Sequence, residues 1–165
     1  LLIETRIVDG RGNSWELKNR ADRTRMKRNT WENRISMQQA YRSRTAFKNW
    51  DEECFNSFIE GGTELLPDGR AQLKCSPEIE AIFYEQRDTF IISKYFKGLT
   101  AEYNILLGDY PRAQNMDEED LVNFLDTVPS AGVKQMGIGS HFLPLEHPKI
   151  ILAEIESFFS LTDTQ

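Results

Sequence analysis

The residue with the clearest chemical potential in this chain is His141, which follows Gly139 in a short glycine-containing turn. The apolar stretch 133–138 precedes it, and a helix is expected to begin at Pro148. Because an imidazole titrates near working pH, it can take a proton from a reacting hydroxyl and return it to a leaving group. The order of strand, turn, histidine and helix is typical of a catalytic histidine at the mouth of an α/β sheet. The segment therefore predicts a general base.

Such a histidine needs a carboxylate that accepts the proton of its other ring nitrogen and holds one tautomer. Two expected strand ends supply candidates for this acid, Glu4 after the first strand and Asp109 after the strand at 103–107. Each also has an ordinary interpretation: Glu4 as the partner of a neighbouring arginine, and Asp109 as a turn residue before Pro111. We predict Glu4 as the acid, with Asp109 as the alternative.

The nucleophile that the histidine would serve is not visible in the sequence. No segment matches the Gly-x-Ser-x-Gly elbow that normally accompanies it. Ser140 is a poor candidate, because adjacent residues in a turn cannot easily present a hydroxyl and an imidazole to each other in line. His147 is expected to cap the next helix or to face solvent. Since the chain also begins without methionine, inside an expected strand, we expect the nucleophile upstream of it.

The composition is that of an ordinary globular chain, with 39% hydrophobic and 28% charged residues and a net charge of −6. No apolar run is long enough to span a bilayer, and neither end reads as a signal peptide or a Ser-Lys-Leu signal. Cys54 and Cys75 lack the spacing of a metal or redox site, so two reduced thiols and no cofactor or metal are expected. These features favour a cytoplasmic location.

The positive charge is concentrated near the start of the chain. Residues 1–50 carry 12 Lys and Arg against 5 Asp and Glu, and the excess is densest between Lys18 and Arg28. Charge runs are usually solvated surfaces, which is the first interpretation of this run. It could also dock the phosphates of a substrate, whereas a nucleic-acid site is disfavoured by the absence of interleaved aromatic residues and by the acidic balance of the whole chain.

Hydrophobic periodicity and turn residues predict an alternation of strands and helices. Strands are expected at 1–8, 103–107 and 133–138, and helices at 31–45, 51–60, 76–86, 117–125 and from 148 onward. Residues 11–29 are expected to form a loop, and 67–69 a turn between two extended pieces. In the helix that begins at Pro148, the expected buried side comprises Ile150, Ile151, Ile155, Phe158 and Phe159. Strands alternating with crossover helices indicate the α/β class and a parallel sheet.

Five strings of residues carry a resemblance to a known family: LLIE, AYRSRTAFKNWDEE, LPDGRAQLKCSPEIEAIFYE, ILLGD and GSHFLPLEHP. The chain resembles the C-terminal half of an α/β-hydrolase. It is most similar to the fungal and bacterial serine hydrolases that include yeast peroxisomal lipase and the fungal toxin-biosynthesis acyl-CoA hydrolases. The resemblance implies strands six to eight of that fold from residues 1–9 and 99–165, with a mainly helical cap inserted at 10–98.

The resemblance also implies an activity: hydrolysis of an ester or thioester with an apolar acyl part. His141 would act as the base, and the acid would be Glu4, as in the lipase group, or Asp109, as in most of the superfamily. Its partners would be the substrate and the missing N-terminal half of the fold, and this chain alone is expected to be inactive. The resemblance also implies a peroxisomal location as an alternative to the cytoplasm. The alternative is a truncated, non-catalytic module that binds a partner through an open sheet edge or the basic run.

Overall fold

The computed structural model describes residues 1–4, 14–87, 93–96, 103–109 and 118–162. The chain divides into two compact units. The first unit comprises Leu1–Val8 with Ile92–Gln165, and the second comprises Asp9–Ile91.

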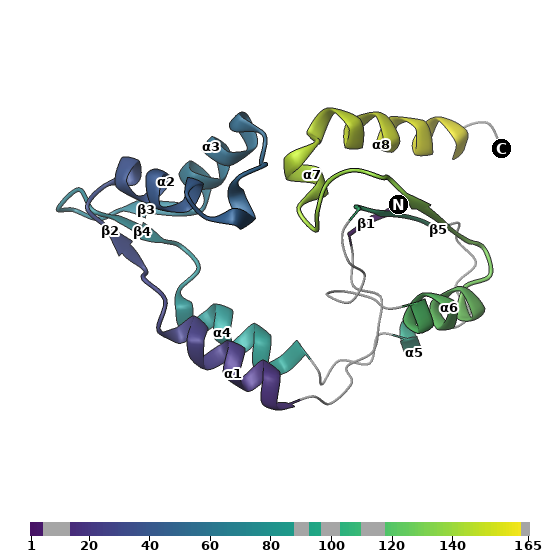
Figure 1. The fold of residues 1–165 in the computed structure, drawn as a ribbon, viewed down its shortest axis with the longest axis horizontal. Coiled ribbons are helices and arrows are strands. Elements are labelled where there is room, and N and C mark those ends of the chain that lie inside the picture. The colour runs from purple at the N-terminus through teal and green to yellow at the C-terminus, as the bar shows by residue number, and fades with distance from the viewer. Residues whose placement is uncertain (5–13, 88–92, 97–102, 110–117, 163–165) are drawn as a thin grey trace. The chain divides into compact units, whose positions relative to one another are not determined.

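The first unit contains a three-stranded parallel sheet in the order β1-β5-β6 (Figure 1). These strands are β1 (Leu2–Ile3), β5 (Tyr103–Leu107) and β6 (Ala131–Gln135). The central strand β5 places Ile105 beside Leu2 and also beside Val133. The predicted parallel α/β arrangement is therefore confirmed.

The last strand was predicted at 133–138, but it lies at 131–135. Beyond it, Gly137 and Gly139 have φ angles of +67° and +72°. These left-handed conformations are accessible to glycine and interrupt an extended strand. The residues that follow β6 therefore form a turn rather than a continuation of the sheet, which shortens the strand at its carboxyl end.

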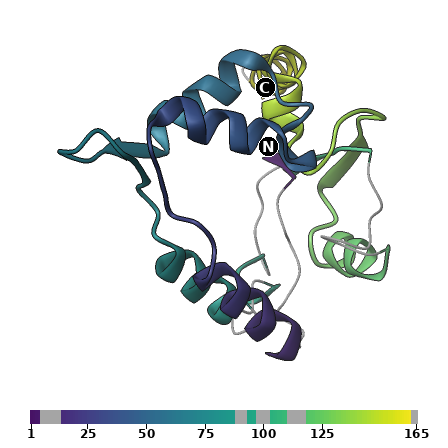
Figure 2. The same ribbon diagram turned by 60° about the vertical axis from the view of Figure 1, so that its left-hand side comes forward.

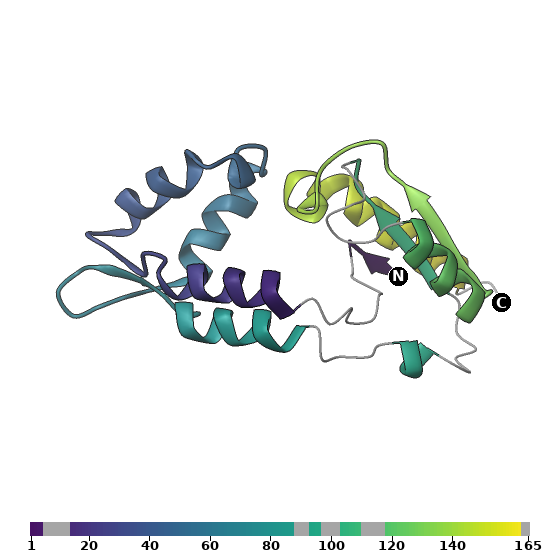
Figure 3. The same cartoon turned by 60° about the horizontal axis from the view of Figure 1, so that its bottom comes forward.

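Helices cover both faces of this sheet (Figure 3). Helix α6 (Glu118–Thr127) lies on one face and α8 (Pro148–Thr162) on the other, while the short helices are α5 (Ser93–Phe96) and α7 (Leu143–Glu146). Because successive side chains of a strand point to opposite faces, β5 contributes to two separate cores.

On one side of the sheet, Ile105 packs with Phe124 and Val128 in the core beneath α6. On the other side, Leu106 packs with Leu143 and Ile151. All of these side chains are buried. The second core joins β5 to α7 and α8, and these are the elements that follow the candidate histidine in the chain.

Helix α8 begins at Pro148 as predicted, but its apolar contact stripe is narrower than expected. Ile151 is buried and Ile155 packs against the same core. Ile150 and Phe159 are 42% and 57% exposed, so their predicted burial was wrong. Residues four apart share one helix face, whereas Ile150 and Phe159 lie to either side of the face that meets the sheet.

The second unit combines helices with a small antiparallel sheet of order β2-β4-β3. Its helices are α1 (Ser14–Arg25), α2 (Arg34–Arg42), the 3₁₀ helix η1 (Thr45–Phe47), α3 (Glu52–Gly61) and α4 (Pro77–Gln86). Its strands are β2 (Thr30–Trp31), β3 (Thr63–Leu65) and β4 (Ala71–Leu73). The predicted turn at 67–69 joins two extended pieces, with Gly69 at a φ of +85°.

Helix α1 corrects the expectation that residues 11–29 form a loop. It lies along α4 in the second unit (Figure 2), where Ala21 of α1 and Ala81 of α4 are fully buried. Small side chains let two helices approach closely without a long apolar stripe, which explains the weak periodicity of this segment. On α4, Ile79 and Phe83 are 49% and 71% exposed.

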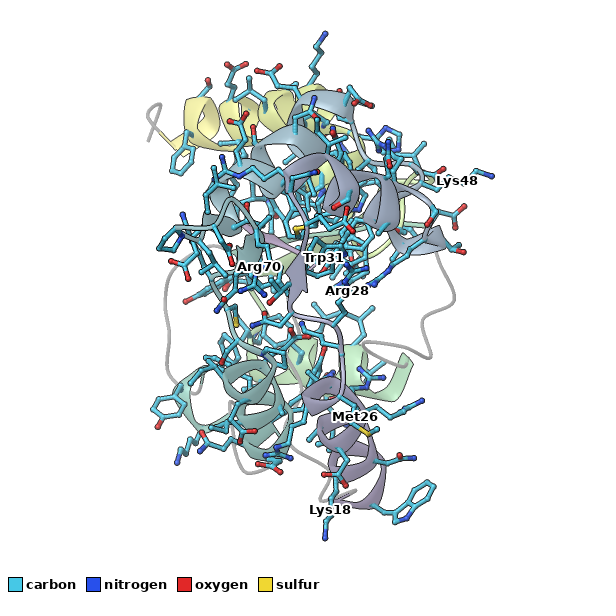
Figure 4. The ribbon with its side chains drawn as sticks, turned by 90° about the vertical axis from the view of Figure 1, so that its left-hand side faces the viewer. Lys18, Met26, Arg28, Trp31, Lys48 and Arg70 are labelled. Carbon is cyan, nitrogen blue, oxygen red and sulfur yellow. The ribbon has the colours of Figure 1, made fainter. Side chains whose placement is uncertain are left out.

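The basic run supplies cations to this helix pair. The Arg25 guanidinium lies 2.9 Å from the Glu78 carboxylate and 2.8 Å from that of Glu85, and Lys27 pairs with Glu80. The hydrogen bonds that Arg25 donates to Glu85 and Glu78 raise its pKa above the ordinary value. Lys18 projects away from the helix, whereas Arg28 lies beside Trp31 (Figure 4). Part of the run is therefore paired within the unit.

Five aromatic residues of the second unit pack into one cluster: Tyr41, Phe47, Trp50, Phe55 and Phe58. Phe47 is central, with ring centroids 4.9 Å from Tyr41, 4.8 Å from Trp50 and 5.5 Å from Phe58. Phe55 is fully buried beside them. These rings pack edge to face or tilted against one another, an arrangement that stabilises aromatic clusters. Mutual packing thus brings together the aromatic residues between Tyr41 and Phe58.

None of the helices within the described residues is both long enough and apolar enough to cross a membrane.

Candidate active site

His141 lies in a loop that is fastened to the carboxyl end of β5. The Met136 N–H donates to the Leu107 carbonyl at 2.8 Å. The Asp109 N–H lies 3.0 Å from the carbonyl oxygens of both Ile138 and Gly139. Because parallel strands bring their carboxyl ends to one edge of the sheet, this loop stands beside the end of β1.

The loop is anchored from below by Leu143, which is fully buried in the core with Leu106 and Ile151. The Leu143 N–H donates to the Ser140 carbonyl at 3.0 Å, so the buried side chain and the loop are joined within three residues. The His141 side chain is 49% exposed. The ring is thus accessible while its backbone rests on a packed core.

Glu4 lies directly after β1 in an unusual backbone conformation. Its N–H donates to the Leu106 carbonyl at 3.0 Å, and its φ is +51°. Among the described residues it is the non-glycine residue with positive φ, a conformation that costs an L-residue roughly 1–2 kcal/mol. Such strain is typical of functional sites, where the surrounding structure holds a side chain in a required direction.

The Glu4 carboxylate faces the histidine. Its Oε2 lies 3.4 Å from His141 Nδ1, and its Oε1 accepts a hydrogen bond from the Gly108 N–H. The Glu4 side chain is only 4% exposed, so both interactions occur away from bulk water. The contact with Glu4 therefore holds the ring through Nδ1.

Gly108 makes this approach sterically feasible. A Cβ at position 108 would lie 3.1 Å from Glu4 Oε1 and 2.6 Å from the Ser140 carbonyl oxygen. The second distance is shorter than real Cβ contacts allow, and the atom involved is backbone that cannot move aside easily. The end of β5 therefore needs a residue without a side chain at this point.

Asp109 occupies the next position, but the structure does not bring its carboxylate to the histidine. Asp109 is exposed, and its backbone N–H donates to the carbonyl oxygens of the loop that carries His141. Within the described part of the chain, the Asp109 carboxylate makes no hydrogen bond with His141. The geometry thus joins Glu4 to His141 and leaves Asp109 outside the pair.

The two neighbouring residues with reactive side chains have other contacts. The Ser140 hydroxyl lies 2.8 Å from Glu146 Oε1. The His147 carbonyl accepts from the N–H groups of Ile150 and Ile151 at 3.1 Å, so His147 caps α8 through its backbone. The role of Glu146 was missed by sequence reasoning; its position just before the helix-opening proline gave no sign that it would fold back onto the loop.

Besides the pair of Glu4 and His141, two features of the described residues concern ligand binding: a surface depression and the grouping of possible metal-binding side chains. A depression of about 260 Å³ lies between β5, β6 and α8, and neither Glu4 nor His141 lines it. Across the described ranges, His, Cys, Asp and Glu residues form no group of three that could hold a metal ion.

Comparison with solved structures finds proteins of the same architecture. The peroxisomal alpha-beta-hydrolase Lpx1 from Saccharomyces cerevisiae matches 96% of this chain and 44% of its own, with a TM-score of 0.77 and 16% identity. E-2-(acetamidomethylene)succinate hydrolase matches 88% of this chain and 53% of its own, with a TM-score of 0.68 and 16% identity. The thioesterase domain from the curacin biosynthetic pathway matches 93% of this chain and 55% of its own, with a TM-score of 0.66 and 14% identity.

The chain therefore spans about half the length of these structures. No protein-family model matches it, and a search of curated proteins finds no match. At such low identity the structural likeness establishes a shared fold.

Proposed function

We propose, on the premise that this chain has the fold of the C-terminal part of an α/β-hydrolase, that it carries the base and the acid of a serine-hydrolase triad. His141 is the base and Glu4 the acid, and the serine is contributed by residues outside this chain. One observation carries the proposal: a buried carboxylate in a strained backbone conformation lies 3.4 Å from Nδ1 of an accessible imidazole.

The proposed reaction follows from this geometry. His141 Nε2 takes the serine proton as the serine oxygen bonds to the substrate carbonyl carbon. The imidazolium then gives that proton to the departing alkoxide or thiolate, and water releases the acyl group in a second round. Glu4 holds the ring and stabilises its positive form, while Gly108 fixes the carboxylate. Loss of this orientation would remove much of the catalytic advantage.

Glu4 is preferred over Asp109 as the acid for geometric reasons. Glu4 is buried and already contacts the ring, whereas Asp109 is exposed and makes no hydrogen bond with His141 in the described residues. An acid that must hold one tautomer benefits from a dry surrounding, because electrostatic interactions are stronger there.

We propose an ester or thioester as the substrate. The similar structures include an esterase from a marine microorganism and a thioesterase domain, which support this class of reaction. An apolar acyl part and a cap formed by residues 10–98 belong to the same proposal. Phosphate docking by the basic run receives less support, since Arg25 and Lys27 are paired with carboxylates of α4.

Labelling with a fluorophosphonate probe tests the proposed function. The longest natural protein that contains this chain should label on an upstream serine, and His141→Ala should slow labelling at least about 10³-fold. His147→Ala is the matched control and should label at the parent rate. If the natural protein begins at this chain and does not label, the non-catalytic binding module would be favoured. If His141→Ala labels at the parent rate, the assignment of His141 as the base would be refuted.

A further inference from the structure

We propose that Glu146 is a positioning residue, whose carboxylate clamps the loop that presents His141. This inference rests on the proposed function, because positioning has a catalytic meaning only if His141 is the base. Glu146 touches neither the ring nor Glu4 in the contacts that define the site, so its effect would pass through the backbone.

The clamp consists of two hydrogen bonds to one residue. Glu146 Oε2 accepts from the Ser140 N–H at 2.5 Å, and Glu146 Oε1 accepts from the Ser140 hydroxyl at 2.8 Å. A carboxylate that uses both oxygens fixes orientation as well as distance. Ser140 directly precedes His141, so the clamp fixes the backbone on the N-terminal side of the histidine.

The Ser140 hydroxyl extends the clamp to the other side of the histidine. Its oxygen accepts from the Phe142 N–H at 3.1 Å while the hydroxyl donates to Glu146. The backbone is therefore held both before and after His141, although the ring itself stays free of these contacts. The hydroxyl serves this local network, which agrees with the expectation that Ser140 is not the nucleophile.

Gly139 provides independent evidence that the carboxylate and the loop must come close. A Cβ at this position would lie 3.2 Å from Glu146 Oε2 and 2.6 Å from Leu143 Cδ1. Its φ of +72° also disfavours any other residue. The glycine thus makes room for the clamp and supplies the turn that delivers Ser140 to it.

The backbone of Glu146 is held in place by helix α7. Glu146 lies at the end of α7, and its N–H donates to the Phe142 carbonyl at 3.0 Å. Helix α7 begins with the fully buried Leu143. Glu146 therefore connects the loop to an element packed on the core, so that the loop geometry is set by the fold.

The clamp should affect turnover because the hydrogen bond between Glu4 and His141 tolerates little further increase in its length. The distance of 3.4 Å lies near the upper limit of a hydrogen bond, and a further shift would break it. A misplacement of about 1 Å near a reacting group can cost about 10²-fold in rate. Release of the loop is thus expected to act on turnover more than on substrate binding.

Glu146→Ala, Glu146→Gln and Glu154→Ala form the test series. Glu154 belongs to the same unit and pairs with Lys134 at 2.6 Å, away from the loop, so its alanine variant is the matched control. In this chain, hydrogen exchange of the Ser140 amide is measured by NMR; in the intact protein, kcat and KM are measured. Urea unfolding of each variant identifies loss of folding.

We expect Glu146→Ala to speed exchange of the Ser140 amide about 10-fold or more and to lower kcat about 10- to 100-fold with little change in KM. Glu146→Gln keeps an oxygen that can accept from the Ser140 N–H and should retain most of both properties, and Glu154→Ala should match the parent. Unchanged Ser140 exchange in a folded Glu146→Ala would overturn the clamp. Faster exchange with an unchanged kcat would overturn its positioning role.

Failure of the proposed function would look different. An intact protein without turnover would remove the serine-hydrolase assignment, while the exchange rate of Ser140 would still decide whether Glu146 holds the loop. If Glu146→Ala unfolds, Ser140→Ala offers a second route, because it removes the hydroxyl bonds and keeps the N–H bond. It should loosen Phe142 but not Ser140, and equal protection of the Phe142 amide would contradict the hydroxyl network.

Discussion

Ester turnover by the intact protein is expected to fall about 10⁴-fold when Glu4 is replaced by glutamine. The glutamine amide keeps the shape of the side chain, and its oxygen can still accept from the Gly108 N–H. Its NH₂ group cannot accept the Nδ1 proton of His141, so the ring loses its stabilised positive form and its preferred tautomer. The measurement is kcat/KM with a chromogenic ester.

Asp109→Asn is the matched control for this experiment. Asp109 lies in the same chain segment as Gly108, and its carboxylate makes no hydrogen bond with His141 in the described residues. We expect its kcat/KM to stay close to that of the parent. A large loss in Asp109→Asn together with a small loss in Glu4→Gln would transfer the acid role to Asp109.

Leu143→Ala is expected to lower the free energy of unfolding of the first unit by about 3 kcal/mol. The side chain is fully buried between Leu106 of β5 and Ile151 of α8, and its removal leaves a cavity that the packed elements cannot readily close. Because the buried Leu143 side chain holds the start of α7 on this core, the variant should loosen the loop of His141 as well. Urea denaturation followed by circular dichroism measures the change.

Leu152→Ala on α8 is the control for this substitution. The same atoms are removed there from a side chain that is 55% exposed, so the expected change is within about 0.5 kcal/mol. Comparable losses in the two variants would contradict the core described here.

The parts of the site that the sequence predicted are those that depend on local patterns. The apolar run before the turn, the glycines around it and the proline that opens α8 all act within a few residues, and they placed His141 correctly after the last strand. Glu4 was identified as a candidate for a similar reason, since it follows a short apolar strand at an expected sheet edge.

The parts that were missed depend on long-range contacts. The bond from the Gly108 N–H to Glu4 joins residues 104 positions apart, and it exists because β1 and β5 pair in one particular register. The left-handed conformation of Glu4 likewise has no signature in the residue type. Such contacts follow from the register of the sheet, which periodicity alone does not specify.

Helix α1 was missed for a related reason. It contacts α4 through the small residue Ala21 and through Arg25, whose partner Glu78 lies 53 positions away. Neither feature produces an apolar stripe, so the segment resembled a polar loop.

The central claim, that Glu4 holds the ring of His141 through Nδ1, can be tested in this chain alone, without the serine that we propose. A long-range ¹H–¹⁵N NMR spectrum of the neutral imidazoles reports which ring nitrogen carries the proton. The ring of His147 makes no hydrogen bond in the described residues and serves as the internal reference. We expect His141 to be protonated on Nδ1, and Glu4→Ala to shift it to the tautomer of His147; a His141 protonated on Nε2 in the parent chain, unaffected by Glu4→Ala, would contradict the claim.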